Sequence, residues 1–204
     1  MEKIKLSFFD TFAYLIPGIL VVLSISIAYK SEIKSLSDIS TSYANLTTTE
    51  ILFIFLSAYI TGIICNYFGH KLYQIAKIVW EEDVASKKKD DLSKEEDDLN
   101  DTEMHVLVRE LSPNNYIYLQ SWLGLSNMSH NIAVAMIVLG GVSVFKMFYI
   151  ETENIIEWVM LLIFCIFSVG IFLKRSIKFN NYFKEEIITT IEKLELLKKA
   201  KIRN

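Results

Sequence analysis

Proline and glycine are scarce in this sequence, which has two prolines and seven glycines among 204 residues. Both residue types mark turns and interrupt helices, so their scarcity argues against a fold of many short strands and favours long helices. More than half of the residues (52%) are hydrophobic, and the mean hydropathy is +0.33. This balance is unusually apolar for a soluble domain and is typical of a helical membrane protein.

The residue types of common catalytic and metal sites are also few. Cys65 and Cys165 both fall inside apolar segments, which indicates buried thiols and no disulfide. The three histidines, His70, His105 and His130, belong to no HExxH motif, and the sequence has no CxxC pair. Glycine-rich phosphate loops and the GxSxG elbow are missing as well. We therefore expect no enzymatic activity, no metal and no other cofactor.

Four apolar runs are long enough to cross a bilayer. About 20 helical residues, at about 1.5 Å each, match a hydrocarbon core that is about 30 Å thick. The first run exceeds the apolar region of a signal peptide, so we expect it to be retained. The fold class is predicted to be all-α: a polytopic membrane protein with four transmembrane helices. The predicted spans are residues 11–29, 51–69, 131–150 and 155–173.

Two polar regions extend this transmembrane domain of residues 1–173. Residues 70–130 form a predicted helical insert, and residues 174–204 form a predicted amphipathic helix. The apolar positions of this C-terminal helix recur in steps of three and four, which defines one stripe; they are Phe179, Phe183, Ile187, Ile191, Leu194 and Leu197. The stripe needs a cover, and the middle insert, a second copy or a partner could each supply it.

The connections differ in composition. Residues 30–49 are rich in Ser and Thr and predict a solvated loop, after which Thr48 or Thr49 is expected to cap a helix with Glu50 in its first turn. Residues 81–101 are dominated by charge and predict a linker. A short helix is expected to end near Leu111, and Ser112-Pro113 to begin the long helix that becomes the third span.

Lysine and arginine are distributed unevenly between the two sides of this topology. Eighteen of the 21 fall before the first span, in the middle insert or in the tail. Only Lys30, Lys34 and Lys146 fall on the other side when Lys146 is counted with the loops. Positively charged loops remain in the cytoplasm, so both termini and the middle insert are predicted to be cytoplasmic.

Five polar residues are expected at one depth, near the cytoplasmic ends of three spans. They are Asp10, Asn66, His70, His130 and Asn131. One interpretation places them in the headgroup zone, where they satisfy helix ends. The other is a hydrogen-bonded cluster of Asp10 with His70 or His130 that acts as a pH-sensitive or ion-responsive latch.

Pro17 and Gly18 interrupt the first span. A proline inside a helix frees one carbonyl, and a neighbouring glycine weakens the helix further. The pair is a candidate hinge, and the alternative is a kink that serves helix packing. Small residues in other spans, including Gly62 and Gly69, would likewise let helices approach one another closely.

A family resemblance rests on segments of the first two spans: Phe9-Asp10, Tyr14-Leu15-Ile16-Pro17-Gly18, Ala58-Tyr59-Ile60-Thr61-Gly62 and Gly69-His70. They resemble a group of small bacterial four-span membrane proteins that are often encoded among anti-phage genes, the group of the Kiwa defence membrane subunit. The resemblance implies an oligomeric protein of the bacterial inner membrane that senses phage-induced disturbance and recruits a cytoplasmic DNA-binding partner. It implies no catalytic residue.

We therefore expect a sensor and scaffold subunit of an anti-phage defence complex. Its expected partners are the lipid bilayer, further copies of the chain, and a cytoplasmic protein bound through residues 70–130 and 174–204, with no direct binding of nucleic acid. The alternative is a pore-forming effector that depolarises the cell. Its lining would need polar positions through the bilayer, and the candidates are few: Ser24, Ser26, Tyr59, Thr61, Ser143 and Ser168.

Overall fold

The computed structural model describes residues 8–80, 101–149 and 154–196, and these ranges form helices and connections without a strand. The all-α prediction is confirmed. The helices are α1 (Phe8–Tyr29), α2 (Ser37–Tyr43), α3 (Thr48–Trp80), α6 (Asp101–Leu111), α7 (Pro113–Tyr149) and α8 (Ile155–Lys193). The predicted linker of residues 81–101 lies almost entirely outside the described residues.

Four helices of the described chain are long and apolar enough to cross a membrane: α1 from Thr11, α3, α7 and α8. This agrees with the four predicted spans and with a multi-pass membrane protein. The predicted domain boundary after Leu173 falls inside α8, because no proline or glycine interrupts the sequence between Leu173 and Lys193. The fourth span and the tail as far as Lys193 therefore form one continuous helix.

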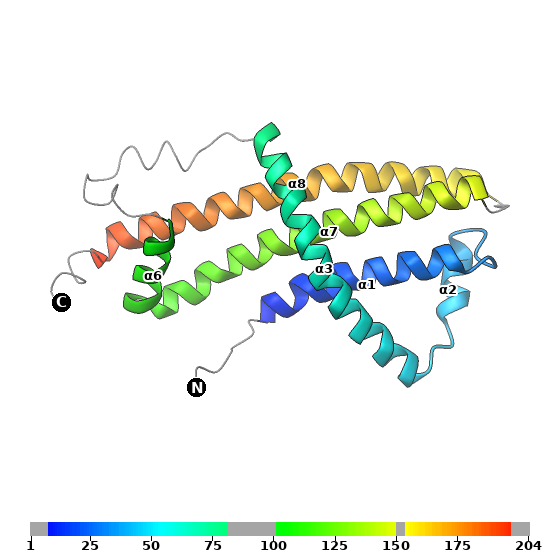
Figure 1. Ribbon diagram of the computed structural model, residues 1–204, viewed down its shortest axis with the longest axis horizontal. Coiled ribbons are helices and arrows are strands. Elements are labelled where there is room, and N and C mark those ends of the chain that lie inside the picture. Colours follow the sequence, from blue (N-terminus) through cyan, green and yellow to red (C-terminus); the bar gives the residue numbers. More distant parts are fainter. Residues whose placement is uncertain (1–7, 81–100, 150–153, 197–204) are drawn as a thin grey trace.

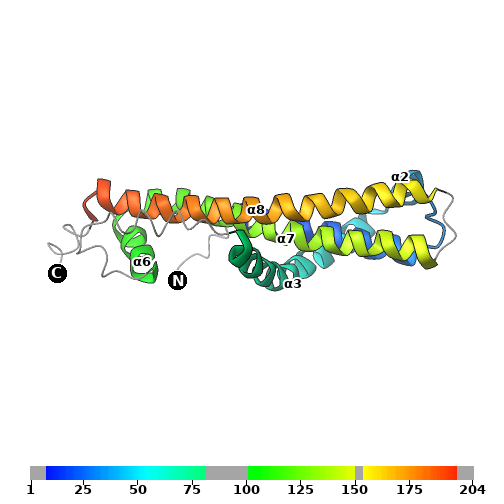
Figure 2. The same cartoon turned by 90° about the horizontal axis from the view of Figure 1, so that it is seen from above.

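The helices α7 and α8 lie antiparallel and side by side, and they form the most extensive contact in the structure (Figures 1 and 2). The helix α1 packs along α7, and α3 crosses both of them obliquely (Figure 1). We call one end of this assembly the α2 end, where α7 ends and α8 begins. The other is the α6 end, where α6 packs against the first turns of α7 and the last turns of α8.

The crossing of α1 and α3 depends on two glycines. A Cβ on Gly18 would overlap the Ala58 carbonyl group, and a Cβ on Gly62 would overlap the Tyr14 carbonyl group. The helix α1 is continuous through Pro17, whose side chain is fully buried. Gly18 thus allows close helix packing, which is the role expected of small residues in membrane helices. Hinge motion at this pair stays a prediction.

The α6 end has its own hydrophobic core. Its buried members are Met104, Val108, Leu119, Phe183, Ile187, Ile188, Ile191 and Leu196. They come from α6, the first turns of α7 and the end of α8, so the middle insert covers the apolar stripe of the tail. Leu197 of that stripe lies outside the described residues. The predicted break between two helices is also present: α6 ends at Leu111 and α7 begins at Pro113.

The prediction of a solvated loop over residues 30–49 holds only in part, because most of the segment is exposed or half-buried but it is not an irregular loop throughout. This segment contains α2, its Ile33 side chain is fully buried, and Ile33 packs with Ile27, Val142 and Trp158. Leu36, Ile39 and Tyr43 of the same segment pack against this cluster, and the neighbouring polar groups form local hydrogen bonds. The helix cap also differs from expectation, because Thr47 exchanges hydrogen bonds with Glu50 and so precedes α3 in a capping box.

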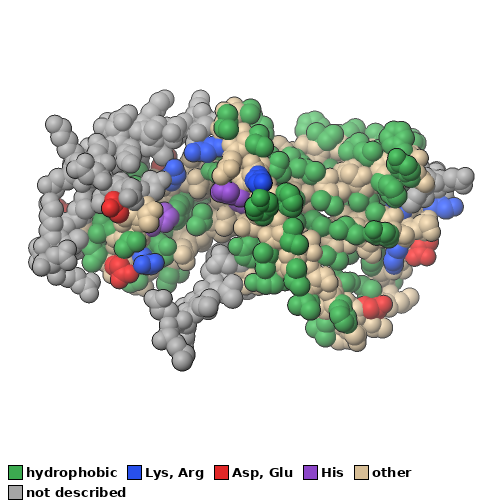
Figure 3. Space-filling model, viewed as in Figure 1, with side chains coloured by type: hydrophobic (Ala, Val, Ile, Leu, Met, Phe, Trp, Pro, Cys, Tyr) green, Lys and Arg blue, Asp and Glu red, His purple; other side chains and the backbone are tan. Residues whose placement is uncertain are grey.

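On the face shown in Figure 3, hydrophobic side chains cover most of the described surface from the middle of the molecule toward the α2 end, and few charged side chains interrupt them. The outer faces of α3 and α8 supply many of the apolar residues, among them Phe53, Leu56, Ile63, Ile163, Phe164 and Phe167. A continuous apolar surface of this extent fits contact with lipid acyl chains.

Candidate functional site

A buried polar cluster joins α3, α7 and α8. His130 of α7 lies with Nδ1 3.2 Å from the Ser176 hydroxyl of α8, and with Nε2 3.4 Å from Oδ1 of Asn66 on α3. Ser126 and Ser176 pair across the two helices: the Ser126 hydroxyl donates to the Ser176 carbonyl at 2.9 Å, and the Ser176 hydroxyl lies 3.0 Å from the Ser126 carbonyl. His130, Ser126 and Ser176 are all buried. These contacts fix the register of α7 against α8.

The proton positions in this cluster follow from its acceptors. Because Asn66 presents an oxygen to Nε2, that nitrogen of His130 carries the proton. The Ser176 hydroxyl has one proton, which it donates either to the other nitrogen of His130 or to the Ser126 carbonyl, while the Ser126 hydroxyl donates to the Ser176 carbonyl in both arrangements. A buried neutral imidazole costs far less than a buried charge, so this arrangement is the stable one. The hydrogen bonds of this cluster act as a clamp between the helices.

Asn131 extends the cluster to α1. Its fully buried side-chain amide donates to the Ala13 carbonyl at 3.1 Å. Its Oδ1 accepts no hydrogen bond from the described residues and faces Gly69, where a Cβ would lie 2.7 Å away. A weak contact with the Cα–H of glycine is the interaction available there. Asn131 thus links α7 to both α1 and α3 at a point where only glycine fits.

The structure brings three of the five predicted polar residues, Asn66, His130 and Asn131, into one buried region. His70 lies at its exposed edge, 6.5 Å from His130 between ring centroids, and contacts Gln74 of its own helix at 3.0 Å. Asp10 belongs to α1, but its side chain lies outside the described residues. A latch between Asp10 and a histidine therefore stays a prediction.

A second polar site, at the α2 end, was missed by sequence reasoning. Lys146 lies in α7, not in a loop, and its side chain is fully buried. Its ammonium donates to the carbonyls of Lys30 and Ile33 at 2.7 and 3.1 Å. The signal was present in the sequence, because a single charge inside an apolar helix is expected to be buried against a partner.

The first turn of α8 holds the same loop from the other side. The Leu36 N–H donates to Glu157 at 2.8 Å, and the Trp158 indole N–H donates to the Lys34 carbonyl at 3.1 Å. Within the loop, Asp38 accepts from the N–H groups of Ser35 and Lys34 at 2.8 and 2.9 Å. Hydrogen bonds from Ser35, and then from Lys34, hold the pKa of Asp38 below its usual range.

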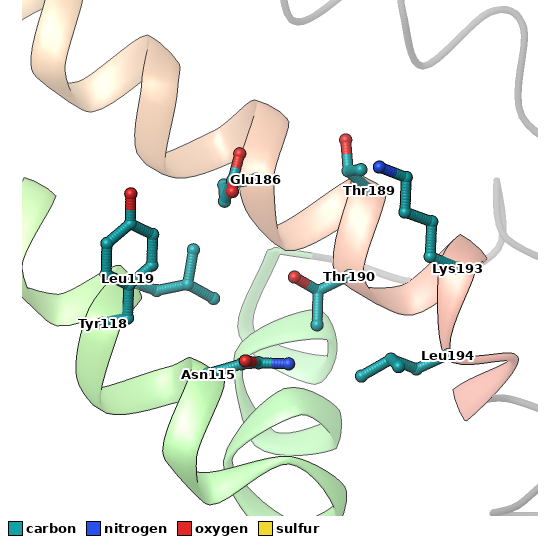
Figure 4. A pocket seen from close by; sticks show the side chains of 8 residues that line it. All are labelled: Asn115, Tyr118, Leu119, Glu186, Thr189, Thr190, Lys193 and Leu194. Atoms are coloured by element: carbon teal, nitrogen blue, oxygen red, sulfur yellow. The ribbon is translucent and has the colours of Figure 1, made fainter.

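At the α6 end, a polar pocket of about 190 Å³ opens between the start of α7 and the end of α8. Figure 4 shows Asn115 and Thr190 facing each other across it, with Lys193 beside Thr189 on the outer edge. The rest of the lining is Tyr118, Leu119, Glu186 and Leu194. The lining side chains include hydrogen-bond donors and acceptors and carry both positive and negative charge. This mixture suits contact with a polar protein surface.

Metal binding finds no support in the described ranges, where no three His, Cys, Asp or Glu side chains gather in a suitable group. Comparison with protein-family models, curated proteins and solved structures finds no match to this chain. The described sites are therefore interpreted from their own chemistry: two buried clamps and one polar surface at the α6 end.

Proposed function

We propose that this protein is a sensor and scaffold subunit of a bacterial anti-phage defence complex in the inner membrane, with both termini in the cytoplasm. The observation that carries the proposal is the small helical bundle at the α6 end. It has a separate hydrophobic core, whose residues lie outside the predicted spans 131–150 and 155–173. A membrane anchor alone needs no such bundle, whereas a docking platform does.

Partner binding would use the surface of this bundle. The pocket beside Asn115, Glu186 and Lys193 presents polar groups of both charges, which favours a protein partner over the phosphate backbone of nucleic acid. The family resemblance supplies the identity of the partner as a proposal: a soluble DNA-binding protein of the same complex. Further copies of the chain would pack through the apolar faces of α3 or α8.

Signal transmission would follow α7 and α8. Each is one helix from the α2 end to the α6 end, so a displacement of the loop held by Lys146 and Trp158 can move the bundle without an intervening hinge. The clamp of Ser126 and Ser176 lies between the two ends and keeps the helices in register. A disturbance of the outer leaflet would act by changing this register.

The pore alternative gains little from the described residues. The hydroxyls of Ser24 and Ser143 donate to the carbonyls of Leu20 and Leu139, each within its own helix. Such hydroxyls are satisfied without water, which supports a packed interior over an aqueous path. Dye release from vesicles that contain only this protein would favour the pore instead.

The direct test is protection against phage by cells that express the chain with its neighbouring genes. Glu186→Arg, which inverts charge at the exposed pocket edge, should lower protection and reduce recovery of the soluble subunit with the membrane protein. Glu32→Arg makes the same change at the exposed α2 end and should leave that recovery unchanged. Equal recovery of the soluble subunit with both variants would contradict a docking role for the bundle.

Orientation needs its own measurement. Lys193→Cys and Glu32→Cys place a thiol on an exposed residue at either end, while Cys65 and Cys165 are buried. A membrane-impermeant maleimide should label the Glu32→Cys protein in intact spheroplasts and the Lys193→Cys protein only after permeabilisation. The reverse pattern would invert the topology and remove the basis for a cytoplasmic partner.

A further inference from the structure

A second cavity lies where α3 ends beside α8, and it has a different chemistry from the pocket at the α6 end. Its volume is about 650 Å³, and it is lined by Trp80, Lys174, Ile177, Lys178, Asn181, Tyr182 and Glu185. Apart from Trp80, the lining comes from one stretch of α8. Ile177 is buried against Tyr73 and Ala76 of α3, which forms an apolar floor between the helices.

The cavity lies at the expected edge of the bilayer. Lys174 directly follows Leu173, the last residue of the apolar part of α8. Lys174 and Lys178 are one helical turn apart and therefore share a face. Trp80 and Tyr182 flank them, and the Lys178 ammonium lies 5.4 Å from the Tyr182 ring centroid. Aromatic and basic side chains in this combination characterise the headgroup zone of membrane proteins.

The order of side chains along α8 matches the order of groups in one class of lipid. Two lysines come first, next to the apolar segment, where a lipid phosphate would lie. Asn181 and Glu185 follow about two turns farther from the bilayer, where hydroxyl groups of a headgroup could donate to the carboxylate or exchange hydrogen bonds with the amide. A choline group offers neither hydroxyls nor a net negative charge.

We propose that this cavity binds an anionic phospholipid with a hydroxylated headgroup, from the leaflet on the α6 side. Lys174 and Lys178 hold the phosphate, Trp80 and Ile177 contact the glycerol backbone, and Asn181 and Glu185 meet the hydroxyls. The bound lipid fills the space between α3 and α8 and so supports the crossing of α3. The assignment depends on the membrane location alone and not on a role in defence.

The chain provides a matched control for this site. Arg175 neighbours Lys174 on the same exposed stretch of α8, yet it does not line the cavity. If binding were only a general attraction of anionic lipid to surface charge, Arg175→Gln would weaken it as much as Lys178→Gln. A specific site at the cavity would lose affinity for the lipid only when Lys174 or Lys178 is replaced. Because all three side chains are exposed, their replacement leaves the packed core intact.

The experiment is native mass spectrometry of the full chain in detergent, titrated with phosphatidylglycerol or phosphatidylcholine. The wild-type protein should retain phosphatidylglycerol and prefer it to phosphatidylcholine. Lys174→Gln and Lys178→Gln should each weaken retention about fivefold, the effect of one basic residue near an anionic headgroup. Arg175→Gln should remain within about twofold of wild type, because screened surface charges contribute little. Circular dichroism should show the same helicity for all variants.

Three results would overturn the proposal. The first is equal retention of the two lipids by the wild-type protein. The second is a loss with Arg175→Gln as large as that with Lys178→Gln, which would reduce the effect to general surface charge. The third is complete displacement of phosphatidylglycerol by excess glycerol phosphate, which would assign the cavity to a soluble phosphate compound and not to a lipid.

Discussion

The ammonium of Lys146 donates to the carbonyl of Lys30 at 2.7 Å, so a fully buried lysine of α7 closes the C-terminal end of α1. The last carbonyls of a helix carry partial negative charge and lack partners within the helix. An ammonium placed there donates hydrogen bonds to such carbonyls. This exchange explains how a charge is tolerated inside the assembly.

Replacement of Lys146 by Met keeps the apolar stem and removes the donor. We expect the free energy of unfolding to fall by about 2 kcal/mol, because the carbonyls of Lys30 and Ile33 lose a charged hydrogen-bond donor. Lys71→Met, at an exposed lysine of α3, should change stability by less than about 0.5 kcal/mol. Denaturant unfolding in detergent measures both, and a Lys146→Met protein as stable as wild type would refute the clamp.

The effect of replacing a glycine by alanine on stability should depend on what surrounds that glycine. At Gly62 an added methyl group meets the Tyr14 backbone, which can yield only if α1 and α3 move apart. Gly62→Ala should therefore lose about 1–3 kcal/mol of stability through overpacking. At Gly141 nothing lies within 4 Å, so Gly141→Ala should gain about 0.5–1 kcal/mol from helix propensity. Thermal unfolding in one detergent compares them, and equal effects would contradict the close crossing.

The serine clamp can be tested with two similar substitutions on α7. Ser126→Ala removes the hydrogen bond from the Ser126 hydroxyl to α8 and should cost about 1 kcal/mol, because a buried hydrogen bond between the two helices is lost. Ser129→Ala removes a bond to the Leu125 carbonyl of the same helix and should cost less than about 0.5 kcal/mol. Chemical unfolding gives both values. A larger loss of stability from Ser129→Ala than from Ser126→Ala would contradict the clamp between α7 and α8.

The loop at the α2 end should loosen in acid. Because the pKa of Asp38 is lower in the folded protein than in the unfolded chain, its contribution to stability is complete above the unfolded value. That contribution is lost as pH falls through the folded value. Proteolysis within residues 30–43 should therefore accelerate at low pH, when measured with an acid-active protease. Asp38→Asn should show the faster cleavage already at neutral pH, with a neutral protease, whereas Ser40→Ala should not.

The helices were largely predictable because their signals are local. Apolar runs of bilayer length set the spans, and Ser112-Pro113 separates α6 from α7 at the predicted place. The stripe on the tail was predictable too, but not its cover. Three different covers for the stripe were compatible with its periodicity. That α6 and α7 cover it depended on how the middle insert folds back. The solvated-loop prediction failed in part because a few apolar side chains in a polar stretch pack into the core: Ile33, Leu36, Ile39 and Tyr43.

The candidate sites, too, were only partly predictable from the sequence. Asn66, His130 and Asn131 could be named from the sequence, since polar residues at the ends of apolar runs stand out. Their partners could not, because Ser126 and Ser176 are 50 residues apart and meet only through the register of α7 and α8.

The sequence by itself determined that the chain forms four apolar helices with polar extensions, since hydropathy and helical periodicity act over neighbouring residues. Only the tertiary structure decided which glycines contact a crossing backbone, which serines pair and which carbonyls receive the buried lysine. These are contacts between distant segments, and they depend on helix angles and rotations that no local pattern encodes.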